Sequence, residues 1–415
     1  MPHNVLYAQS GGVTAVINAS ACGVIETVHR HPEHFCKVFA ARDGILGILH
    51  EELYDLALET PSEIAALRHT PGGAFGSCRA DLGEPDTHPE QYARLLAVIR
   101  AHDIGTFIYN GGGGSMLTAA KVARFARLND LDLNVIGVPK TIDNDLPKTD
   151  TSPGFGSAAK YIATSVREVS RDLAAMSGTS TKVFIMEVMG RHAGWLAAAA
   201  GLAFETEDYP LLLMFPETPF MERDFTAALQ EYIARYGWCI VVVAEGLLCS
   251  DLSFCVQAQR SMTFGHEQLG GMAPQLATLT RKLGYKTHWA VSDYFQRSAR
   301  HIASKVDVEQ AYACGVAAVT HAMSGRSDVM VSIRRTSDEP YLWTLDAVPL
   351  DEVADVELPV PAEYIRADGF GITAAARRYM LPLIQGEDIP PFRDGLPVFA
   401  ELKLQMAVKC LPDWA

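Results

Sequence analysis

Short apolar runs alternate along most of this chain with longer segments in which apolar residues recur at every third or fourth position. The short runs predict buried strands, and the longer segments predict helices that pack on them. Strands are predicted at residues 4–8, 105–109, 134–139, 181–188, 238–244 and 329–335, with strand and loop over 34–56. Helices are predicted at residues 13–29, 89–102, 115–128, 157–176 and 193–204. Strands that alternate with helices predict an α/β protein with parallel sheets.

Glycine-rich turns follow two of these strands. Residues 9–12 read Gln-Ser-Gly-Gly, and residues 110–115 read Asn-Gly-Gly-Gly-Gly-Ser. Backbone amides at such a turn form an anion site together with the positive end of the next helix, which we expect Ser115 to cap. Gly11 and Gly12 are equally compatible with a tight strand-to-helix connection that binds nothing. The stretch at 110–115 matches neither the Walker pattern nor the dinucleotide fingerprint.

The stretch at 134–145 joins a strand to a dense group of reactive side chains. The apolar run ends at Pro139, which offers no amide to a sheet, and the loop beyond it carries Lys140, Thr141, Asp143 and Asp145. Ligands of α/β sheets bind beyond the carboxyl ends of strands, so these groups could hold and deprotonate a phosphorylated substrate. The alternative is a solvated loop in which Asp and Asn only form turns.

Arginines and a glutamate mark further candidate positions. Arg79 ends a glycine-containing loop, residues 70–79, that we expect to be flexible, and its guanidinium suits a phosphate oxygen. Arg191 and Glu245 each follow a predicted strand, where ligand contacts are favoured over a surface ion pair. A basic patch is predicted between 281 and 301, formed by Lys286, Tyr294, Gln296, Arg297 and Arg300. No chemistry is predicted beyond about residue 325.

Composition limits the function classes. With 415 residues, 48% hydrophobic and 20% charged, the chain is long enough for two or three domain-sized cores. A formal charge of −14 argues against general binding to nucleic acid or to anionic membranes. Any phosphate site must therefore be local and built from a few basic groups.

The cysteines indicate a reducing compartment. Their spacing includes no Cys-x-x-Cys pair, which fits reduced thiols better than zinc ligands or a disulfide framework. The positions are Cys22, Cys36, Cys78, Cys239, Cys249, Cys255, Cys314 and Cys410. No secretory signal pattern begins the chain and no apolar run approaches the ~18 residues that span a bilayer, so a cytoplasmic location is expected.

Several of these stretches, in this order and at these separations, resemble the phosphofructokinase family over roughly the first 320 residues. They read Pro-Lys-Thr-Ile-Asp-Asn-Asp at 139–145, Met-Gly-Arg at 189–191, Ala-Glu-Gly at 244–246 and Tyr-Phe-Gln-Arg at 294–297. The opening Tyr-Ala-Gln-Ser-Gly-Gly-Val-Thr-Ala-Val-Ile-Asn at 7–18 looks most like the pyrophosphate-dependent branch found in bacteria.

The resemblance implies two αβα, Rossmann-like domains with the active site in the cleft between them, plus a C-terminal extension. Residues 1–150 would bind the donor phosphates, and the chain would return to that domain around 294–325. Residues 151–293 would bind the sugar phosphate, and residues 326–415 would form the extension. The implied reaction transfers a phosphoryl group from pyrophosphate to the 1-hydroxyl of fructose 6-phosphate. Its product is fructose 1,6-bisphosphate, formed in a reversible step of glycolysis.

The roles implied by the resemblance are assigned position by position. Asp143 matches the general base, and Lys140 matches the lysine that stabilises the charge developing between the two phosphates. Asp145 matches a carboxylate that supports Mg²⁺. The sugar and the transferring phosphoryl group would be contacted by Thr141, Ile142, Asp143, Met189, Gly190, Arg191, Glu245, Tyr294, Phe295, Gln296 and Arg297, with help from Lys286. The donor would be contacted by Gly12, Arg79, Gly113, Gly114 and Ser115.

Lys182 resembles a basic group that a neighbouring subunit lends in this family, which implies a homo-oligomer, either a dimer or a tetramer. The chain departs from the family pattern at Gly113 and Gly114, where members carry an acidic residue that helps hold the metal and excludes the α-phosphate of ATP. Weaker metal binding is therefore expected. ATP stays open as the donor, as does a regulatory subunit that binds sugar phosphate without catalysis. A dinucleotide-binding oxidoreductase would need a fingerprint that the chain lacks.

Overall fold

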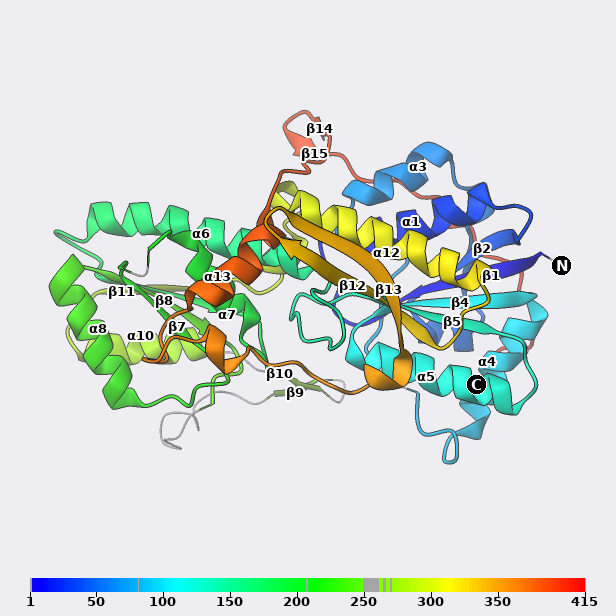
Figure 1. The fold of residues 1–415 in the computed structure, drawn as a ribbon, viewed down its shortest axis with the longest axis horizontal. Helices are drawn as coiled ribbons and strands as arrows, with labels where there is room; N and C mark the ends of the chain where they lie inside the picture. The colour runs from blue at the N-terminus through cyan, green and yellow to red at the C-terminus, as the bar shows by residue number, and fades with distance from the viewer. Residues whose placement is uncertain are drawn as a thin grey trace. The chain divides into compact units, whose positions relative to one another are not determined.

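The structure is a computed structural model that describes residues 2–80, 82–206, 208–248, 261–263, 266–268 and 271–414. The predicted Cys249 and Cys255 thiols lie outside these residues. The chain forms two compact units, each drawn with its own sheet in Figure 1. Unit 1 contains Met1–Ser157, Ser298–Glu357 and Gly386–Ala415, and unit 2 contains Ala158–Arg297 and Leu358–Gln385.

Unit 1 is built on one mixed sheet with strand order β13-β12-β5-β4-β1-β2-β3. The pairs among β2, β1, β4, β5 and β12 are parallel, and the edge strands β3 and β13 are antiparallel to their neighbours. The strands are β1 (His3–Gln9), β2 (Phe35–Ala41), β3 (Leu53–Asp55), β4 (Ile104–Gly111), β5 (Asn134–Pro139), β12 (Val329–Asp338) and β13 (Tyr341–Pro349). Strand β2 lies on one side of β1, and the later strands β4 and β5 lie on the other side. The carboxyl ends of β1, β4 and β5 are therefore neighbours at the switch point of the sheet.

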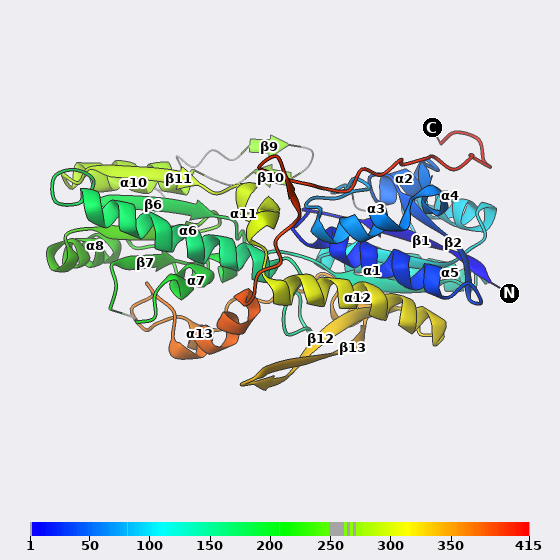
Figure 2. The same ribbon diagram turned by 90° about the horizontal axis from the view of Figure 1, so that it is seen from above.

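Helices cover both faces of this sheet, as Figures 1 and 2 show. One apolar core joins the sheet to α2, α4 and α5, and another joins it to α1 and α12. The helices are α1 (Ile17–Arg30), α2 (Ile45–Leu49), α3 (Pro61–Ala66), α4 (Pro89–Ala101), α5 (Gly113–Leu128) and α12 (Lys305–Met323), with short 3₁₀ turns at Leu56–Leu58, Leu67–His69, Arg300–Ile302 and Leu350–Glu352. The backbones of helices α1 and α12 are in direct contact at Gly23. A Cβ at this position would lie 2.2 Å from the backbone carbonyl oxygen of Tyr312.

Unit 2 is built on a parallel sheet with strand order β11-β6-β8-β7. The strands are β6 (Val183–Val188), β7 (Leu211–Met214), β8 (Cys239–Ala244) and β11 (Thr287–Val291). In Figure 1, α6 lies along one face and α8 with α10 along the other, and the latter pair shares an apolar core with β6, β7 and β8. The helices are α6 (Phe155–Met176), α7 (Trp195–Ala200), α8 (Glu222–Tyr236), α10 (Met272–Lys282), α11 (Phe295–Ser298) and α13 (Ala374–Met380).

Smaller elements complete the chain. Two short hairpins are formed by β9 (Ser261–Thr263) with β10 (His266–Gln268) and by β14 (Phe392–Arg393) with β15 (Leu396–Pro397), and 3₁₀ turns occur at Gly201–Ala203, Ala362–Tyr364 and Leu381–Ile384. No helix in the described part of the chain is both long enough and apolar enough to cross a membrane.

The α/β class with parallel sheets is confirmed, while several local expectations need correction. The stretch at 34–56, read as strand and loop, also contains helix α2. The expected cap at Ser115 is wrong, because α5 already begins at Gly113 and has Gly112 at its N-cap. Glycines that place no side chain against the turn let the helix start earlier than the hydroxyl suggested. The residues after 325 are shared between both units rather than set apart.

The end of the chain forms a strap along the edge strand β3 of unit 1. The Ala407 amide donates to the Leu53 carbonyl at 2.7 Å, and the Asp55 amide donates to the Gln405 carbonyl at 2.8 Å. Carboxylates from the first part of the chain accept from further strap amides, namely Glu63 from Glu401, Glu59 from Lys403 and Leu404, and Glu51 from Cys410 and Leu411. The strap thus covers a sheet edge that would otherwise be open to other chains.

Candidate active site

The glycine turn after β1 and the loop after β5 converge in unit 1. Gly11 has a φ of +75°, and a Cβ there would lie 3.3 Å from the Lys140 Nζ. The Lys140 amide donates to the Gly111 carbonyl at 3.1 Å, which joins the β4 loop to the same place. Three sequence-distant loops therefore meet at the carboxyl edge, where the strand order predicts a ligand site.

The 140–145 loop is packed into the protein and is not a solvated turn. Lys140 is 3% exposed and Thr141 is 9% exposed, whereas Asp143 and Asp145 keep part of their surface accessible. The Thr141 hydroxyl donates to the Asp143 carboxylate at 3.3 Å and accepts from the Asp143 amide at 3.1 Å. Asn144, in the left-handed region at φ +53°, is held by its Oδ1, which accepts from the Ser152 amide at 3.0 Å.

Burial and neighbouring charge change the pKa of both aspartates. Burial raises the pKa of Asp143, while the positive charges of Lys140 and Arg79 act in the opposite direction. Burial also raises the pKa of Asp145 to about 7, with the negative charge of Asp143 as the next cause. Glu357, far along the chain, adds to the rise at both. Carboxyls held together in this way favour either a proton or a cation between them.

Arg79 lies near this group, on a loop that is tied down rather than flexible as expected. The Gly11 amide donates to the Cys78 carbonyl at 2.9 Å, and the Ser77 hydroxyl donates to the Gly11 carbonyl at 2.7 Å. These bonds fasten the residues directly before Arg79 to the glycine turn. Gly12, which the resemblance implies is a donor contact, is the next residue of that turn.

Buried amide side chains hold the other end of the same loop. Asn18 Nδ2 donates to the Thr70 carbonyl at 2.9 Å, and Asn18 Oδ1 accepts from the Ala74 amide at 3.0 Å. Gln9 Nε2 donates to Asn18 Oδ1 at 3.0 Å. Both side chains are 0% exposed. Asn18 in the first turns of a helix was visible in the sequence, but its role depends on a loop more than fifty positions away.

The glycine loop after β4 has room for a side chain. A Cβ on Gly113 would meet only the Val356 oxygen at 3.9 Å and the Leu146 Cδ2 at 4.0 Å. Ser115, predicted as a donor contact, is buried, and its Oγ would lie 2.1 Å from a Cβ on Gly111. Its hydroxyl is therefore packed beneath the turn, and Gly114 is the exposed residue of the loop.

The candidate groups of unit 2 follow three neighbouring strands, β6, β8 and β11. The Met189 amide donates to Gln296 Oε1 at 3.2 Å, which joins the β6 loop to the β11 loop. The Gly246 amide donates to the Gly190 carbonyl at 3.1 Å, next to Glu245. These contacts gather Met189–Arg191, Glu245 and the 294–297 segment at one sheet edge. Ile142 belongs to unit 1, where it is 6% exposed.

Glycine is required at this edge for packing. A Cβ on Gly246 would lie 1.8 Å from the Arg191 oxygen, and Gly190 has a φ of +134°. A side chain at either place would displace the backbone that carries Arg191.

Two residues of the 294–297 segment are open to solvent, while Gln296 is buried. Tyr294 is 63% exposed and Phe295 is 70% exposed, and the Arg297 guanidinium lies over the Tyr294 ring at 3.9 Å from its centroid. A stacked arginine and phenol form a cationic surface that suits a phosphate ester.

The residues predicted to form one basic patch between 281 and 301 do not all lie together, so that prediction is wrong. Lys286 precedes β11 and donates to the Ser180 hydroxyl at 2.7 Å, so it lies at the amino edge of the sheet, about 17 Å from the carboxyl edge by strand rise. Lys286 therefore cannot assist Tyr294 and Arg297 within one chain. Arg300 belongs to unit 1, where it is 1% exposed and pairs with Asp388. Lys182, like Lys286, lies at the amino edge.

Among the described residues, one cluster of metal-ligand types was found, formed by Glu51, His102 and Cys410. The Glu51 carboxylate already accepts from His102 Nε2 at 2.8 Å and from the Leu411 amide at 3.0 Å. Arg94 Nη2 lies 3.6 Å from the same carboxylate. These donors leave little capacity for a cation, so the cluster anchors the strap.

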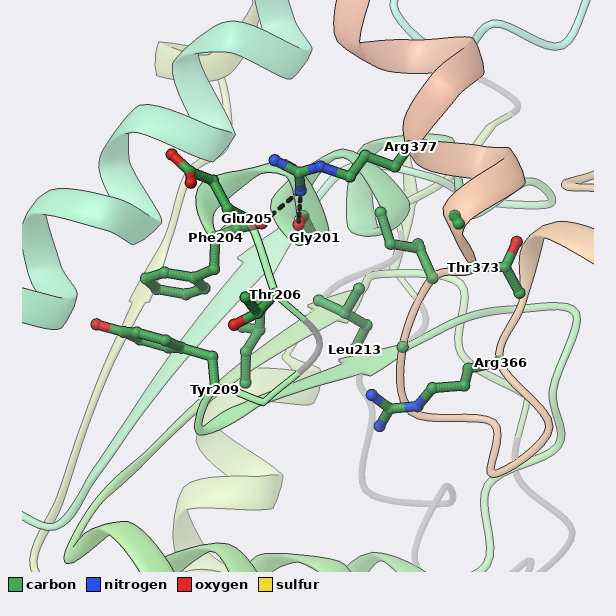
Figure 3. Close-up of a pocket in the computed structure, with 13 residues that line it drawn as sticks. Gly201, Phe204, Glu205, Thr206, Tyr209, Leu213, Arg366, Thr373 and Arg377 are labelled. Atoms are coloured by element: carbon green, nitrogen blue, oxygen red, sulfur yellow. Dashed lines mark hydrogen bonds between the residues drawn. The ribbon is translucent and has the colours of Figure 1, made fainter.

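A cavity in unit 2 is distinct from the candidate groups. Figure 3 shows it between the Gly201–Ala203 turn, β7 and the 366–377 segment, with Phe204, Tyr209 and Leu213 in its wall. Arg377 donates to the carbonyl oxygens of Gly201 and Phe204, and Arg366 pairs with Asp368. None of the predicted site residues lines this cavity, and its arginines are engaged by protein groups.

Known proteins resemble this chain in both sequence and fold. The model of the family described as "Phosphofructokinase" matches residues 4–322. The chain is 55% identical to pyrophosphate--fructose 6-phosphate 1-phosphotransferase of Halomonas elongata, covering 99% of both chains. It is also 55% identical to the protein of that name from Methylococcus capsulatus, covering 96% of both chains. The crystal structure of a pyrophosphate-dependent phosphofructokinase from Marinobacter aquaeolei matches with a TM-score of 0.91 and 52% identity, covering 99% of both chains.

Proposed function

The chain belongs to the phosphofructokinase family, and from that premise we propose that it phosphorylates fructose 6-phosphate at the 1-hydroxyl with pyrophosphate as donor. The products are fructose 1,6-bisphosphate and inorganic phosphate, in a reversible step of glycolysis. The observation that carries this proposal is identity of 53–55% over nearly the full chain to three proteins named for this reaction. The convergence of the three unit 1 loops on Lys140 supports it.

Asp143 is the general base in the proposed reaction. The 1-hydroxyl oxygen attacks a phosphorus of pyrophosphate, its proton passes to Asp143, and the bond from that phosphorus to the bridging oxygen breaks as phosphate leaves. The raised pKa of Asp143 favours this role, since a more basic carboxylate takes a proton more readily. The Thr141 hydroxyl, 3.3 Å from that carboxylate, orients it.

Lys140 and Arg191 stabilise the charge of the transferring group. Phosphoryl transfer needs mainly positioning and neutralisation of charge. Lys140, nearly buried beside the Gly11 turn, offers a cation that water screens little. The donor is bound by Gly12, Arg79, Gly113 and Gly114. The buried Ser115 packs against the glycine turn.

The carboxylates of unit 1 fit Mg²⁺. The negative charge of Asp143 helps to raise the pKa of Asp145, so a cation beside this pair is favoured, and hard oxygen ligands are those that Mg²⁺ prefers. Asp145 would hold the ion together with donor phosphates and water. When bound, Mg²⁺ neutralises charge on the phosphates.

Unit 2 binds the sugar phosphate in this proposal. Glu245 accepts from the sugar hydroxyls, and Tyr294 with Arg297 binds the 6-phosphate, while Met189 and Gly190 shape the contact and Gln296 holds the Met189 amide. Phe295 contributes apolar surface. The protein is a homo-oligomer, a dimer or a tetramer, in which a neighbouring subunit lends Lys182. We place it in the cytoplasm, and the described free thiols support that proposal.

ATP remains the second candidate donor because Gly113 and Gly114 carry no acidic side chain. Purified protein should be assayed with fructose 6-phosphate, Mg²⁺ and either donor. The proposal predicts turnover with pyrophosphate and a kcat/KM for ATP lower by about 10²-fold or more, the loss of well-positioned donor contacts. Preferred use of ATP would overturn the donor, and no product with either would leave a non-catalytic binding subunit.

The glycine loop gives a sharper test of donor choice. Gly114 has no positive φ and is exposed, so Gly114→Asp is tolerated by the backbone. The added carboxylate should suppress any residual ATP turnover and leave pyrophosphate turnover in place. An unchanged ratio of the two activities would contradict the proposed position of the donor.

A further inference from the structure

Asn144 lies between Asp143 and Asp145 and is 3% exposed. Its backbone is in the left-handed region, at φ +53°, which asparagine tolerates better than most residues but which still needs support from its surroundings. The Asn144 Oδ1 provides that support, since it accepts from the Ser152 amide at 3.0 Å and from the Thr151 hydroxyl at 3.1 Å. The path of the chain between the two aspartates therefore depends on where Thr151 and Ser152 lie.

Strand β12 fixes the residues directly before these two. The Ile333 amide donates to the Thr149 hydroxyl oxygen at 3.0 Å, and the Ile333 carbonyl accepts from the Asp150 amide at 2.7 Å. The Thr149 hydroxyl in turn donates to the Thr151 carbonyl at 3.0 Å. Ile333 is 1% exposed and Thr149 is 9% exposed, so water competes little for these bonds. The loop at 149–151 is thus held by β12 in the way that a neighbouring strand would be held.

A nearly buried ion pair fastens the same loop to the hairpin formed by β12 and β13. Arg335 Nε donates to the two carboxylate oxygens of Asp150 at 3.0 and 3.1 Å, and both side chains are 13% exposed. The Tyr341 hydroxyl donates to the same carboxylate at 3.2 Å and accepts from Gln310 Nε2 at 2.9 Å. Hydrogen bonds to a charged group in such a place are strong, and removal of Arg335 would leave the Asp150 charge poorly compensated.

We propose that the β12–β13 hairpin is a positioning element for the catalytic loop, in which Arg335 holds Asp150 and the residues that follow hold Asn144 between the two aspartates. The inference rests on the proposed role of Asp143 as general base, and it makes Arg335 and Asn144 positioning residues for that carboxylate. The family model ends at residue 322, so the hairpin lies outside the matched part of the chain. A region in which the sequence predicted no chemistry therefore helps to set the geometry of the 140–145 loop.

The first test separates turnover from sugar-phosphate binding. Arg335→Gln should lower kcat with pyrophosphate by about 10²-fold, the loss typical of a misplaced reacting group, while the Kd for fructose 6-phosphate changes by less than about 2-fold. The matched control is Arg334→Gln on the same strand, because Arg334 is 63% exposed and pairs with Asp346 at 3.2 Å on the surface. This control should behave as wild type.

Two milder variants show whether the ion pair itself is responsible. Arg335→Lys keeps the positive charge and should recover about 10-fold of the lost kcat. Tyr341→Phe removes one donor to Asp150 and should lower kcat by a smaller factor, about 5-fold, without a change in the Kd for fructose 6-phosphate. Tyr341→Phe also keeps the inference testable if Arg335→Gln does not fold. A fall in kcat that is matched by an equal loss of sugar-phosphate affinity would overturn the inference, because it would indicate a general loss of structure.

The second test measures the loop directly and needs no turnover. Hydrogen exchange is followed by mass spectrometry in peptides that cover the Asp150 and Ser152 amides, with no substrate present. Arg335→Gln should speed exchange at these amides by about 10-fold, since the bonds that hold the loop to β12 open more often, whereas Arg334→Gln should not. Unchanged exchange in Arg335→Gln would overturn the inference.

These outcomes are distinct from failure of the proposed function. If wild-type protein forms no fructose 1,6-bisphosphate with either donor while Arg335→Gln speeds exchange at the Ser152 amide, the reaction is refuted and the attachment of the loop to the hairpin stands. If wild-type protein turns over and Arg335→Gln has the kcat of Arg334→Gln, the positioning role alone is refuted.

Discussion

The two units present their candidate groups in opposite ways. In unit 1, Lys140 and Thr141 are almost fully buried, and Asp143 and Asp145 are desolvated enough to shift their pKa upwards. In unit 2, Tyr294 and Phe295 are largely exposed to solvent, although Gln296 next to them is buried. Groups that act on developing charge are most effective when they are fixed and shielded from water, whereas groups that select a sugar phosphate can be open to its arrival. Burial thus separates Lys140 and Thr141 from Tyr294 and Phe295, whereas Arg191 of unit 2, which is also proposed to act on the transferring group, is partly exposed.

The units also hold their loops by different means. Unit 1 uses buried side chains, since Asn18 binds the backbone of the 70–79 loop and Gln9 donates to Asn18 and accepts from the Phe75 amide of that loop. Unit 2 uses missing side chains, since Gly190 and Gly246 let two backbones touch. Removal of a polar side chain should therefore disrupt the loop of unit 1, whereas addition of a methyl group should disrupt the loops of unit 2.

The largest effect is expected for Asp143→Ala. Loss of the base should lower kcat by about 10³-fold, while the Kd for fructose 6-phosphate changes by less than about 2-fold. Steady-state kinetics and calorimetric titration of the sugar phosphate measure the two quantities. Near-normal turnover would show that unit 1 does not provide the base.

Gly246→Ala should act on unit 2 almost as strongly. The methyl group would lie 1.8 Å from the Arg191 oxygen, and the resulting shift should lower kcat/KM for fructose 6-phosphate by about 10²-fold. The control is Gly178→Ala, because a Cβ there meets nothing within 4 Å and the φ of Gly178 is not positive. Equal kinetics of the two variants would mean that close backbone contact does not position Arg191.

Asn18→Ala should weaken donor binding by a smaller amount. Two loop hydrogen bonds are lost, so the KM for pyrophosphate should rise by about 10-fold and hydrogen exchange at the Ala74 amide should speed up. Thr27→Val, on the same helix, serves as control because it removes a buried hydroxyl that donates to the Gly23 carbonyl and accepts from Arg30 Nη2, without touching the 70–79 loop in the described contacts. If the KM for fructose 6-phosphate rose instead, the 70–79 loop would contact the sugar phosphate and not the donor.

Glu51→Gln should leave catalysis unchanged and lower stability by about 2 kcal/mol at pH 7. Burial acts to raise the pKa of Glu51, but bonds from the Cys410 amide and His102 prevail, and the pKa is lowered. A lowered pKa means that the stabilisation is present above the ordinary glutamate pKa of about 4.3 and is lost as pH falls through the folded-state value. Denaturant unfolding of both proteins at neutral and acidic pH measures this. A difference that persists at low pH would contradict the role of the carboxylate.

Much of the fold could be predicted because apolar runs end where polar or glycine loops begin. Pro139 ends β5 as expected, and the groups after β6 and β8 lie at one sheet edge because parallel strands share their direction. The same reasoning could have placed Lys286 correctly, since a residue that precedes its strand belongs to the opposite edge. Reading the 281–301 basic residues as one patch ignored that polarity.

Other features depend on contacts that no local pattern contains. Arg300 looks like a surface cation until Asp388 is brought beside it, and Glu51 looks like a turn residue until the strap reaches it. The role of the buried Asn18 amide could not be predicted either, because it depends on contacts with the distant 70–79 loop.

The central claim, that unit 1 binds the donor and unit 2 binds the sugar phosphate, is tested most directly by crossed binding measurements on two arginine variants. Calorimetric titrations of methylenediphosphonate and fructose 6-phosphate into Arg79→Ala and Arg297→Ala give four affinities to compare with wild type. The account predicts that Arg79→Ala weakens only the pyrophosphate analogue and that Arg297→Ala weakens only fructose 6-phosphate, each by about 10-fold for a lost charged contact. The opposite pattern, or equal losses for both ligands in both variants, would contradict it.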